Sequence, residues 1–208
     1  MKTKITITLD QARSWFRSGN EELALEAFGK EALVGSFRDI ATFEKACEVL
    51  GFHHGAMISD VDFIATISVG MAAMFKLNII RKALNLGYDL HFTENPKDSF
   101  FYYPYNPLLP EGCNHYYLKS GICQIIGKVK IEGVKYNVLS GLVAYDIDSG
   151  GFKWQAKVCE CRSSVSFFGC AIKEIAEHFG KYFGMLITEA KYGDLEDFEI
   201  LESKYAMD

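Results

Sequence analysis

The spacing of hydrophobic residues changes near Tyr88, from a helical period to the alternation that is typical of strands. Between residues 59 and 86, apolar side chains cover almost the whole circumference of a helix. A helix that is apolar on nearly every side is normally buried. We therefore predict one long central core helix over residues 59–86, ending before Gly87.

Helix caps divide the sequence that precedes this segment. Thr8 and Gln11 have the spacing of a capping box, which predicts that a helix begins there. A second short helix is expected to follow it. Residues 43–50 form a third predicted helix, with Thr42 as its N-cap and Gly51 as the residue that ends it.

A last helix is predicted over residues 167–191, where apolar residues recur at i, i+3, i+4 and i+7. Gly180 and Gly184 lie beside its apolar face. Each glycine costs about 1 kcal/mol relative to alanine inside a helix. We therefore expect close packing against another part of the chain at these two positions, or against a second copy in a homodimer.

The second half of the chain is predicted to contain an antiparallel meander between about residues 115 and 161. Glu132 and Gly133 separate two alternating runs, which is the pattern of a two-residue hairpin. Residues 152–158 alternate apolar with polar, as expected for a strand with one buried face. The predicted fold class is α+β: about four to five antiparallel strands packed with the central helix and the C-terminal helix, preceded by short helices.

Length and composition are those of an ordinary globular chain: 208 residues, 49% hydrophobic and 24% charged. We predict a single domain over residues 1–192, followed by an acidic tail over residues 193–208. The tail accounts for the net charge of −5, because six acidic residues face one lysine there. These residues are Asp194, Glu196, Asp197, Glu199, Glu202 and Asp208 against Lys204.

The N-terminus lacks the apolar stretch and cleavage site of a signal peptide. The longest uncharged apolar stretch, residues 63–75, has 13 residues, fewer than the roughly 18 needed for a membrane span. We therefore expect a soluble, cytoplasmic protein without membrane association. The six cysteines are expected to be free thiols.

A group of lysines on the solvent-exposed face of the predicted sheet is the first candidate site. Lys130 is expected opposite Lys135, and Lys128 opposite Asn137. Like charges in this arrangement repel, which suggests a compensating anion: a phosphate backbone, a nucleotide, the acidic tail or solvent counterions. A solvated polar face without a ligand is the preferred interpretation, because a one-sided antiparallel sheet normally shows such a face. The residues of this candidate site are Lys128, Lys130, Lys135, Lys153 and Lys157.

Cysteine and histidine residues near the meander form a second candidate site, for zinc. Their spacing differs from the usual pairs of zinc ligands, and cysteine is often buried simply as a small apolar residue. We therefore predict no metal and no cofactor. The zinc candidates are Cys113, His115, Cys123, Cys159 and Cys161.

Three further motifs have simpler structural explanations. Residues 146–151 begin like a calcium loop, but Lys157 stands where the bidentate glutamate belongs, which favours a hairpin turn. The aromatic run 100–105 is either a base-stacking platform, a partner-binding patch or, by preference, a strand over the core. His178 and Glu174 are expected to form a solvated i, i+4 pair. No cysteine or carboxylate stands at the spacing of a metal ligand from His53 and His54.

Five segments, which make up about a quarter of the chain and carry no catalytic signature, are residues 5–20, 41–51, 80–88, 102–105 and 173–183. Together they resemble a loose set of uncharacterised proteins from gut Bacteroidetes and their phages. The resemblance implies a cytoplasmic protein of a phage or mobile element, and no residue role follows from it.

The function that these observations favour is a non-enzymatic binding module that uses the lysine-bearing sheet face. Its partner would be a protein or an anionic ligand, with nucleic acid as one such ligand. The alternative is an enzyme that acts on a nucleotide or nucleic-acid phosphate with the same lysines. A flat polar sheet face would favour binding, whereas a hollow with convergent histidine or carboxylate groups would favour an enzyme. The sequence leaves a monomer and a homodimer open.

Overall fold

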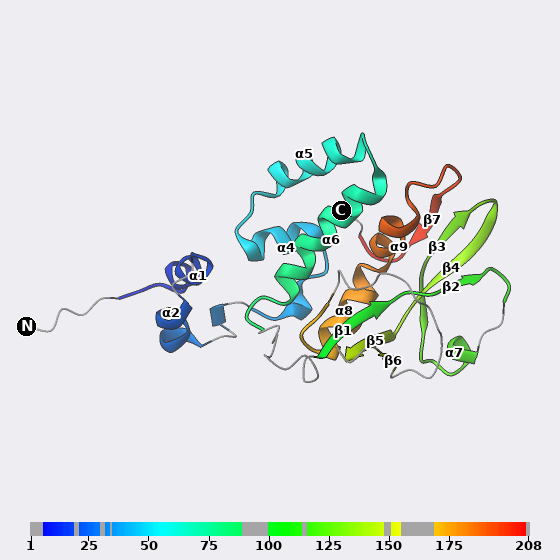
Figure 1. Ribbon diagram of the computed structural model, residues 1–208. Helices are drawn as coiled ribbons and strands as arrows, with labels where there is room; N and C mark the ends of the chain where they lie inside the picture. The colour runs from blue at the N-terminus through cyan, green and yellow to red at the C-terminus, as the bar shows by residue number, and fades with distance from the viewer. Residues whose placement is uncertain are drawn as a thin grey trace, which may run out of the picture.

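The fold is α+β with antiparallel sheets, as predicted (Figure 1). No helix among the described residues combines the length and hydropathy needed to span a membrane. No disulfide joins the four cysteines at positions 47, 113, 123 and 170. The computed structural model describes residues 6–18, 21–29, 32–33, 35–88, 100–113, 116–147, 151–154 and 169–206.

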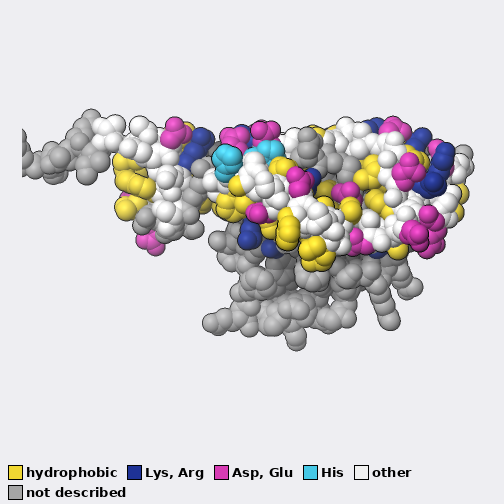
Figure 2. Space-filling view, turned by 90° about the horizontal axis from the view of Figure 1, so that it is seen from above, with side chains coloured by type: hydrophobic (Ala, Val, Ile, Leu, Met, Phe, Trp, Pro, Cys, Tyr) yellow, Lys and Arg dark blue, Asp and Glu magenta, His cyan; other side chains and the backbone are white. Residues whose placement is uncertain are grey.

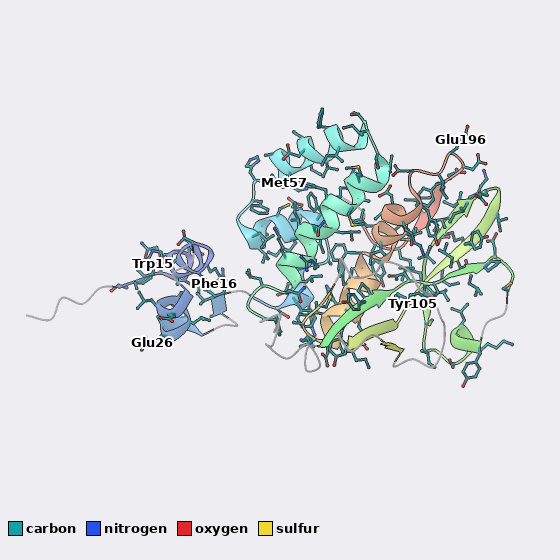
Figure 3. All side chains as sticks on the ribbon, in the orientation of Figure 1. Trp15, Phe16, Glu26, Met57, Tyr105 and Glu196 are labelled. Carbon is teal, nitrogen blue, oxygen red and sulfur yellow. The ribbon has the colours of Figure 1, made fainter. Side chains whose placement is uncertain are left out.

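Two short helices, α1 (Leu9–Arg17) and α2 (Glu21–Phe28), form a hairpin to one side of the remaining structure (Figure 1). The predicted capping box is confirmed, since the Thr8 side chain accepts from the Gln11 amide and the Gln11 side chain accepts in return. Phe16 is buried between the two helices, while its neighbour Trp15 is 38% exposed (Figure 3). This hairpin therefore has a small hydrophobic core of its own.

The third predicted helix is confirmed at both ends. Helix α4 (Phe43–Leu50) begins at Thr42, whose side chain accepts from the Lys45 amide, and ends at Gly51 in a left-handed conformation. A short 3₁₀ turn, η1 (Phe37–Asp39), precedes it. Phe37 of this turn is buried in the main core.

The prediction of one helix over residues 59–86 is wrong. The segment forms α5 (His54–Ala65) and α6 (Val69–Leu84). Ser68 separates them, because its hydroxyl caps the Met71 amide and donates to Asp194 at 2.6 Å. Ile67 beside this break is 71% exposed, so only α6 is the central core helix.

The last predicted helix is also divided, into α8 (Lys173–Tyr182) and α9 (Gly184–Tyr192). Phe183 has φ −117° and ψ 10° and interrupts the helical path. The two glycines lie where the prediction required a close neighbour: Gly180 against Pro104, and Gly184 against Asn106. Packing within one chain therefore accounts for both residues.

The strands form two antiparallel sheets. In the first, the order is β1 (Phe100–Tyr105), β5 (Leu142–Ile147) and β6 (Gly151–Trp154). In the second, the order is β2 (Leu108–Pro110), β4 (Val134–Ser140), β3 (Gln124–Ile131) and β7 (Glu199–Ser203). Helix α7 (Tyr116–Lys119) precedes β3. The strands of the predicted meander are thus divided between two sheets, and β7 comes from the acidic segment 193–208.

The hairpin between β3 and β4 is confirmed. Glu132 and Gly133 have φ values of 49° and 79°, which match the mirror-image turn that suits the twist of paired strands. The division between the sheets occurs at Gly141, where φ is +110° and a Cβ atom would overlap the Ile122 carbonyl. Glycine at this position therefore lets the chain pass from β4 to β5.

The main core lies between the helices, and a smaller one joins them to the second sheet. Helix α6 packs along α9, and the fully buried Leu77 and Ile80 belong to the same cluster as Phe179 of α8 (Figure 1). Met185 of α9 packs against Ile126 and Val129 of β3. The face of the second sheet that bears these residues is therefore buried. The opposite face carries lysines near the hairpin and, around the buried Leu139, a small apolar cluster with Cys123.

We expect Gly184→Ala to destabilise the fold by about 1–3 kcal/mol, because a new Cβ overlaps the side chains of Asn106 and Ile126. Gly180→Ala is the comparison, since its Cβ would lie 3.1 Å from Pro104 and alanine regains about 1 kcal/mol of helix propensity. Urea unfolding of both variants measures the difference. Equal effects of the two substitutions would contradict the packing described at Gly184.

Candidate functional site

The predicted lysine pairing across the β3–β4 hairpin is confirmed. Lys130 lies opposite Lys135, and Lys128 lies opposite Asn137. The apolar residues of β3 alternate with these lysines and face α9. The lysines therefore share the polar face of the second sheet.

The acidic segment supplies most of the carboxylates that accompany these amines. Lys128 Nζ lies 3.2 Å from Glu111 and 3.7 Å from Glu202, and Lys130 Nζ lies 3.4 Å from Glu199. The hydrogen bond to Glu111 is the largest cause of a raised pKa at Lys128. Strand β7 pairs directly with β3, which places Glu199 and Glu202 beside the lysines. Hence three lysines and three glutamates share this surface.

The other two predicted lysines do not belong to the described part of this sheet. Lys153 belongs to β6 in the three-stranded sheet, and Lys157 lies outside the described residues. Basic and acidic side chains lie next to each other at the right-hand end in Figure 2, which is the sheet end of the molecule. We define the mixed-charge face as the surface formed by Lys128, Lys130, Lys135, Glu111, Glu199 and Glu202.

The candidate zinc ligands do not form a recognisable site in the described part of the chain. Cys113 is exposed, whereas Cys123 is buried beside Leu139. Burial raises the pKa of the Cys123 thiol, which disfavours the thiolate that a metal would need. No group of three potential ligands occurs among the residues described. His115, Cys159 and Cys161 lie outside them.

The aromatic run supports the core interpretation. Residues 100–105 form β1, in which Tyr103 is 5% exposed. Tyr102 packs on the main core and forms a backbone bridge with Cys170, the pKa of which burial raises to about 12. The segment 146–151 pairs as in a hairpin, as far as it is described. Ile147 pairs with Gly151, and residues 148–150 lie outside the described structure.

The two histidines at the start of α5 have structural roles. His53 Nδ1 accepts from the Ala56 amide at 3.3 Å and caps the helix. The His54 ring packs edge-on against Phe43, with the ring centroids 5.8 Å apart.

The prediction of a solvated pair between His178 and Glu174 is wrong. His178 Nε2 lies 2.7 Å from the carbonyl oxygen of Ile40. A carbonyl oxygen only accepts, so Nε2 carries the proton and Nδ1 holds the lone pair when the ring is neutral. The ring also contacts Phe37 and Tyr182, with centroid distances of 5.7 and 4.5 Å. Burial, followed by the charges of Lys181 and Arg38, lowers the pKa of His178, while the bond to Ile40 opposes this shift.

His178 lines an open cavity of about 330 Å³ between η1 and the outer side of α8. The helical members recur at i, i+3, i+4, i+7 and i+8, so they form one stripe. The sequence predicts only the solvated His178–Glu174 pair on this side of α8, because the contact with η1 involves residues more than 130 positions away. The lining residues are Phe37, Arg38, Glu174, Glu177, His178, Lys181 and Tyr182.

Comparison with known proteins identifies no relative. No protein-family model matches the chain, and neither a curated protein nor a solved structure is significantly similar to it. Function is therefore inferred from the two sites just described.

We expect folding stability to decrease as the pH falls from 7.5 to 5.5, in part because of His178. Its pKa in the folded state is below the usual value of 6.5, so the unfolded chain binds more protons in this range. The stabilisation that neutral His178 gives to the folded state is complete above pH 6.5 and is lost as the pH falls toward the pKa of His178 in the folded state. Urea unfolding at both pH values should show a smaller loss for His178→Gln, and an unchanged loss would contradict the assignment.

Proposed function

We propose that the protein is a non-enzymatic binding module and that it recognises a protein partner through the mixed-charge face. The observation that carries this proposal is the ladder of ion pairs between β3 and β7. An exposed part of a sheet that carries both charge signs suits a partner with the complementary pattern. Such patterns provide specificity and faster association more than they provide affinity.

The same ion pairs disfavour a polyanionic ligand. Binding to nucleic acid depends on several basic residues that neutralise phosphates and release counterions. Here Glu111, Glu199 and Glu202 already compensate Lys128 and Lys130 at distances of 3.2–3.7 Å. The alternative of an enzyme that holds phosphate with these lysines would face the same competition. The cavity that does contain a histidine and two glutamates, at His178, has none of these lysines in its lining.

The proposed partner surface is easily rearranged. The side chains of Lys128 and Lys130 are 35% and 41% exposed, and exposed ion pairs contribute at most about 1 kcal/mol each. A partner can therefore replace individual pairs at small cost. Together with the resemblance to phage-associated proteins, this supports a cytoplasmic accessory or host-interaction factor as the proposed context.

We expect the unmodified protein to pass through a heparin column at low salt. The triple variant Glu111→Gln, Glu199→Gln and Glu202→Gln should be retained, because it leaves the lysines uncompensated, and added salt should elute it. The control Glu22→Gln, Glu26→Gln and Glu44→Gln makes the same change of net charge on exposed positions of α2 and α4. Retention of the unmodified protein, or equal retention of both variants, would contradict charge compensation at the mixed-charge face.

We expect Lys128→Gln with Lys130→Gln to lose a specific protein partner that affinity capture from source cells recovers with the unmodified chain. Lys191→Gln on α9 is the control and should retain it, and thermal melting checks that all variants are folded. Direct titration with the purified partner should show at least tenfold weaker binding by the double variant. Recovery of nuclease-sensitive material instead of a protein, or equal binding by the variants, would contradict the proposal.

A further inference from the structure

The cavity beside His178 is separate from the mixed-charge face and has a different chemical character. Its wall contains three neighbouring aromatic rings, those of Phe37, His178 and Tyr182. Tyr182 contacts His178 within the wall and Tyr205 outside it, with centroid distances of 4.5 and 4.8 Å. His178 in turn contacts Phe37 at 5.7 Å. Since Phe37 is buried, the partly exposed faces of His178 and Tyr182 are the ones that another flat ring can stack on.

Two cationic side chains, Arg38 and Lys181, line the cavity beside these aromatic rings. The Arg38 guanidinium lies 4.8 Å from the centre of the Phe37 ring, and Lys181 Nζ lies 5.0 Å from the centre of the Tyr182 ring. Neither forms an ion pair within the part of the chain that the structure describes. Both therefore remain able to bind an anionic group.

The acidic residues of the cavity compensate these cations only in part. Glu177 lies 3.5 Å from Lys173, which is outside the cavity lining. Glu174 lines the cavity as well, and Asp39 of η1 also acts on His178. The lining therefore holds equal numbers of cations and carboxylates, but neither Arg38 nor Lys181 is held by them in an ion pair among the described residues.

We propose that this cavity binds a small planar anion, namely an aromatic ring that carries a phosphate or carboxylate group. The ring stacks on His178 and Tyr182, and the anionic group lies between Arg38 and Lys181. A volume of about 330 Å³ is at the lower end of ligand pockets, which restricts the ligand to about the size of one nucleotide. The neutral His178 offers Nδ1 as a hydrogen-bond acceptor to the same ligand.

Proton NMR of the imidazole signals tests this site directly, because the chain has only 5 histidines and His178→Gln identifies the relevant signal. The probes are adenosine monophosphate and 4-hydroxybenzoate, which carry a phosphate and a carboxylate on an aromatic compound. Adenosine and inorganic phosphate supply the ring and the anion separately. We expect one or both ring anions to shift the His178 signal with saturation, and each separate component to bind at least tenfold more weakly.

Substitutions then distinguish a built site from general attraction to lysines. Arg38→Gln with Lys181→Gln should weaken binding at least tenfold, and Tyr182→Leu should also weaken it by removing the stacking surface. Lys191→Gln is the matched control, since Lys191 Nζ lies 5.0 Å from the Tyr192 ring in the same geometry but outside the cavity. It should leave the dissociation constant within twofold.

The proposal is overturned if no ring anion shifts the His178 signal at millimolar concentration, or if adenosine binds as well as its phosphate. Equal loss of binding in the Lys191→Gln control would also overturn it. Because Arg38 and Lys181 make no ion pair among the described residues, their substitution should leave the melting temperature close to that of the unmodified chain. Tyr182→Leu provides a second test if the double variant is unstable.

Discussion

The side-chain amide of Asn106 joins the parts of the molecule that the backbone alone leaves separate. Asn106 lies between β1 and β2, which belong to different sheets. Its Nδ2 donates to the carbonyl of Leu139 in β4 at 2.9 Å and to that of Gly180 in α8 at 2.7 Å. Both amide protons are thus used inside the protein, where an unmade bond would cost about 1–3 kcal/mol. Gly184 must lack a side chain to admit this amide, so the joint also determines where α9 begins.

Features that depend on neighbours in sequence were predictable. The capping box at Thr8, the ends of α4 and the hairpin at Glu132 all follow from interactions between residues up to four positions apart. The opposition of Lys130 and Lys135 follows from that hairpin, because a two-residue turn fixes the register of its strands. Mixed α+β architecture follows in turn from the change of hydrophobic period near Tyr88.

The remaining features depend on partners far along the chain, and the sequence pattern contains no signal for them. The division between α5 and α6 uses Asp194, which accepts from Ser68 and from the Gly70 amide across more than 120 residues. These hydrogen bonds also lower the pKa of Asp194. The acidic composition of β7 is not typical of a strand, so the sequence does not predict it. Its glutamates nevertheless form favourable ion pairs with Lys128 and Lys130. Figure 3 shows Glu196 at the outer end of the turn that carries the chain from α9 to β7.

The joint at Asn106 also connects the fold to the cavity. Holding the Gly180 carbonyl fixes the rotation of α8, with Ile175 and Phe179 in the core. The opposite stripe, with His178 and Tyr182, must then face η1. A ligand would meet side chains that are already fixed by the bond to Ile40 and by ring contacts, which reduces the entropy lost on binding. The mixed-charge face relies on exposed side chains instead, so it suits a partner that adjusts many weak contacts over a larger area.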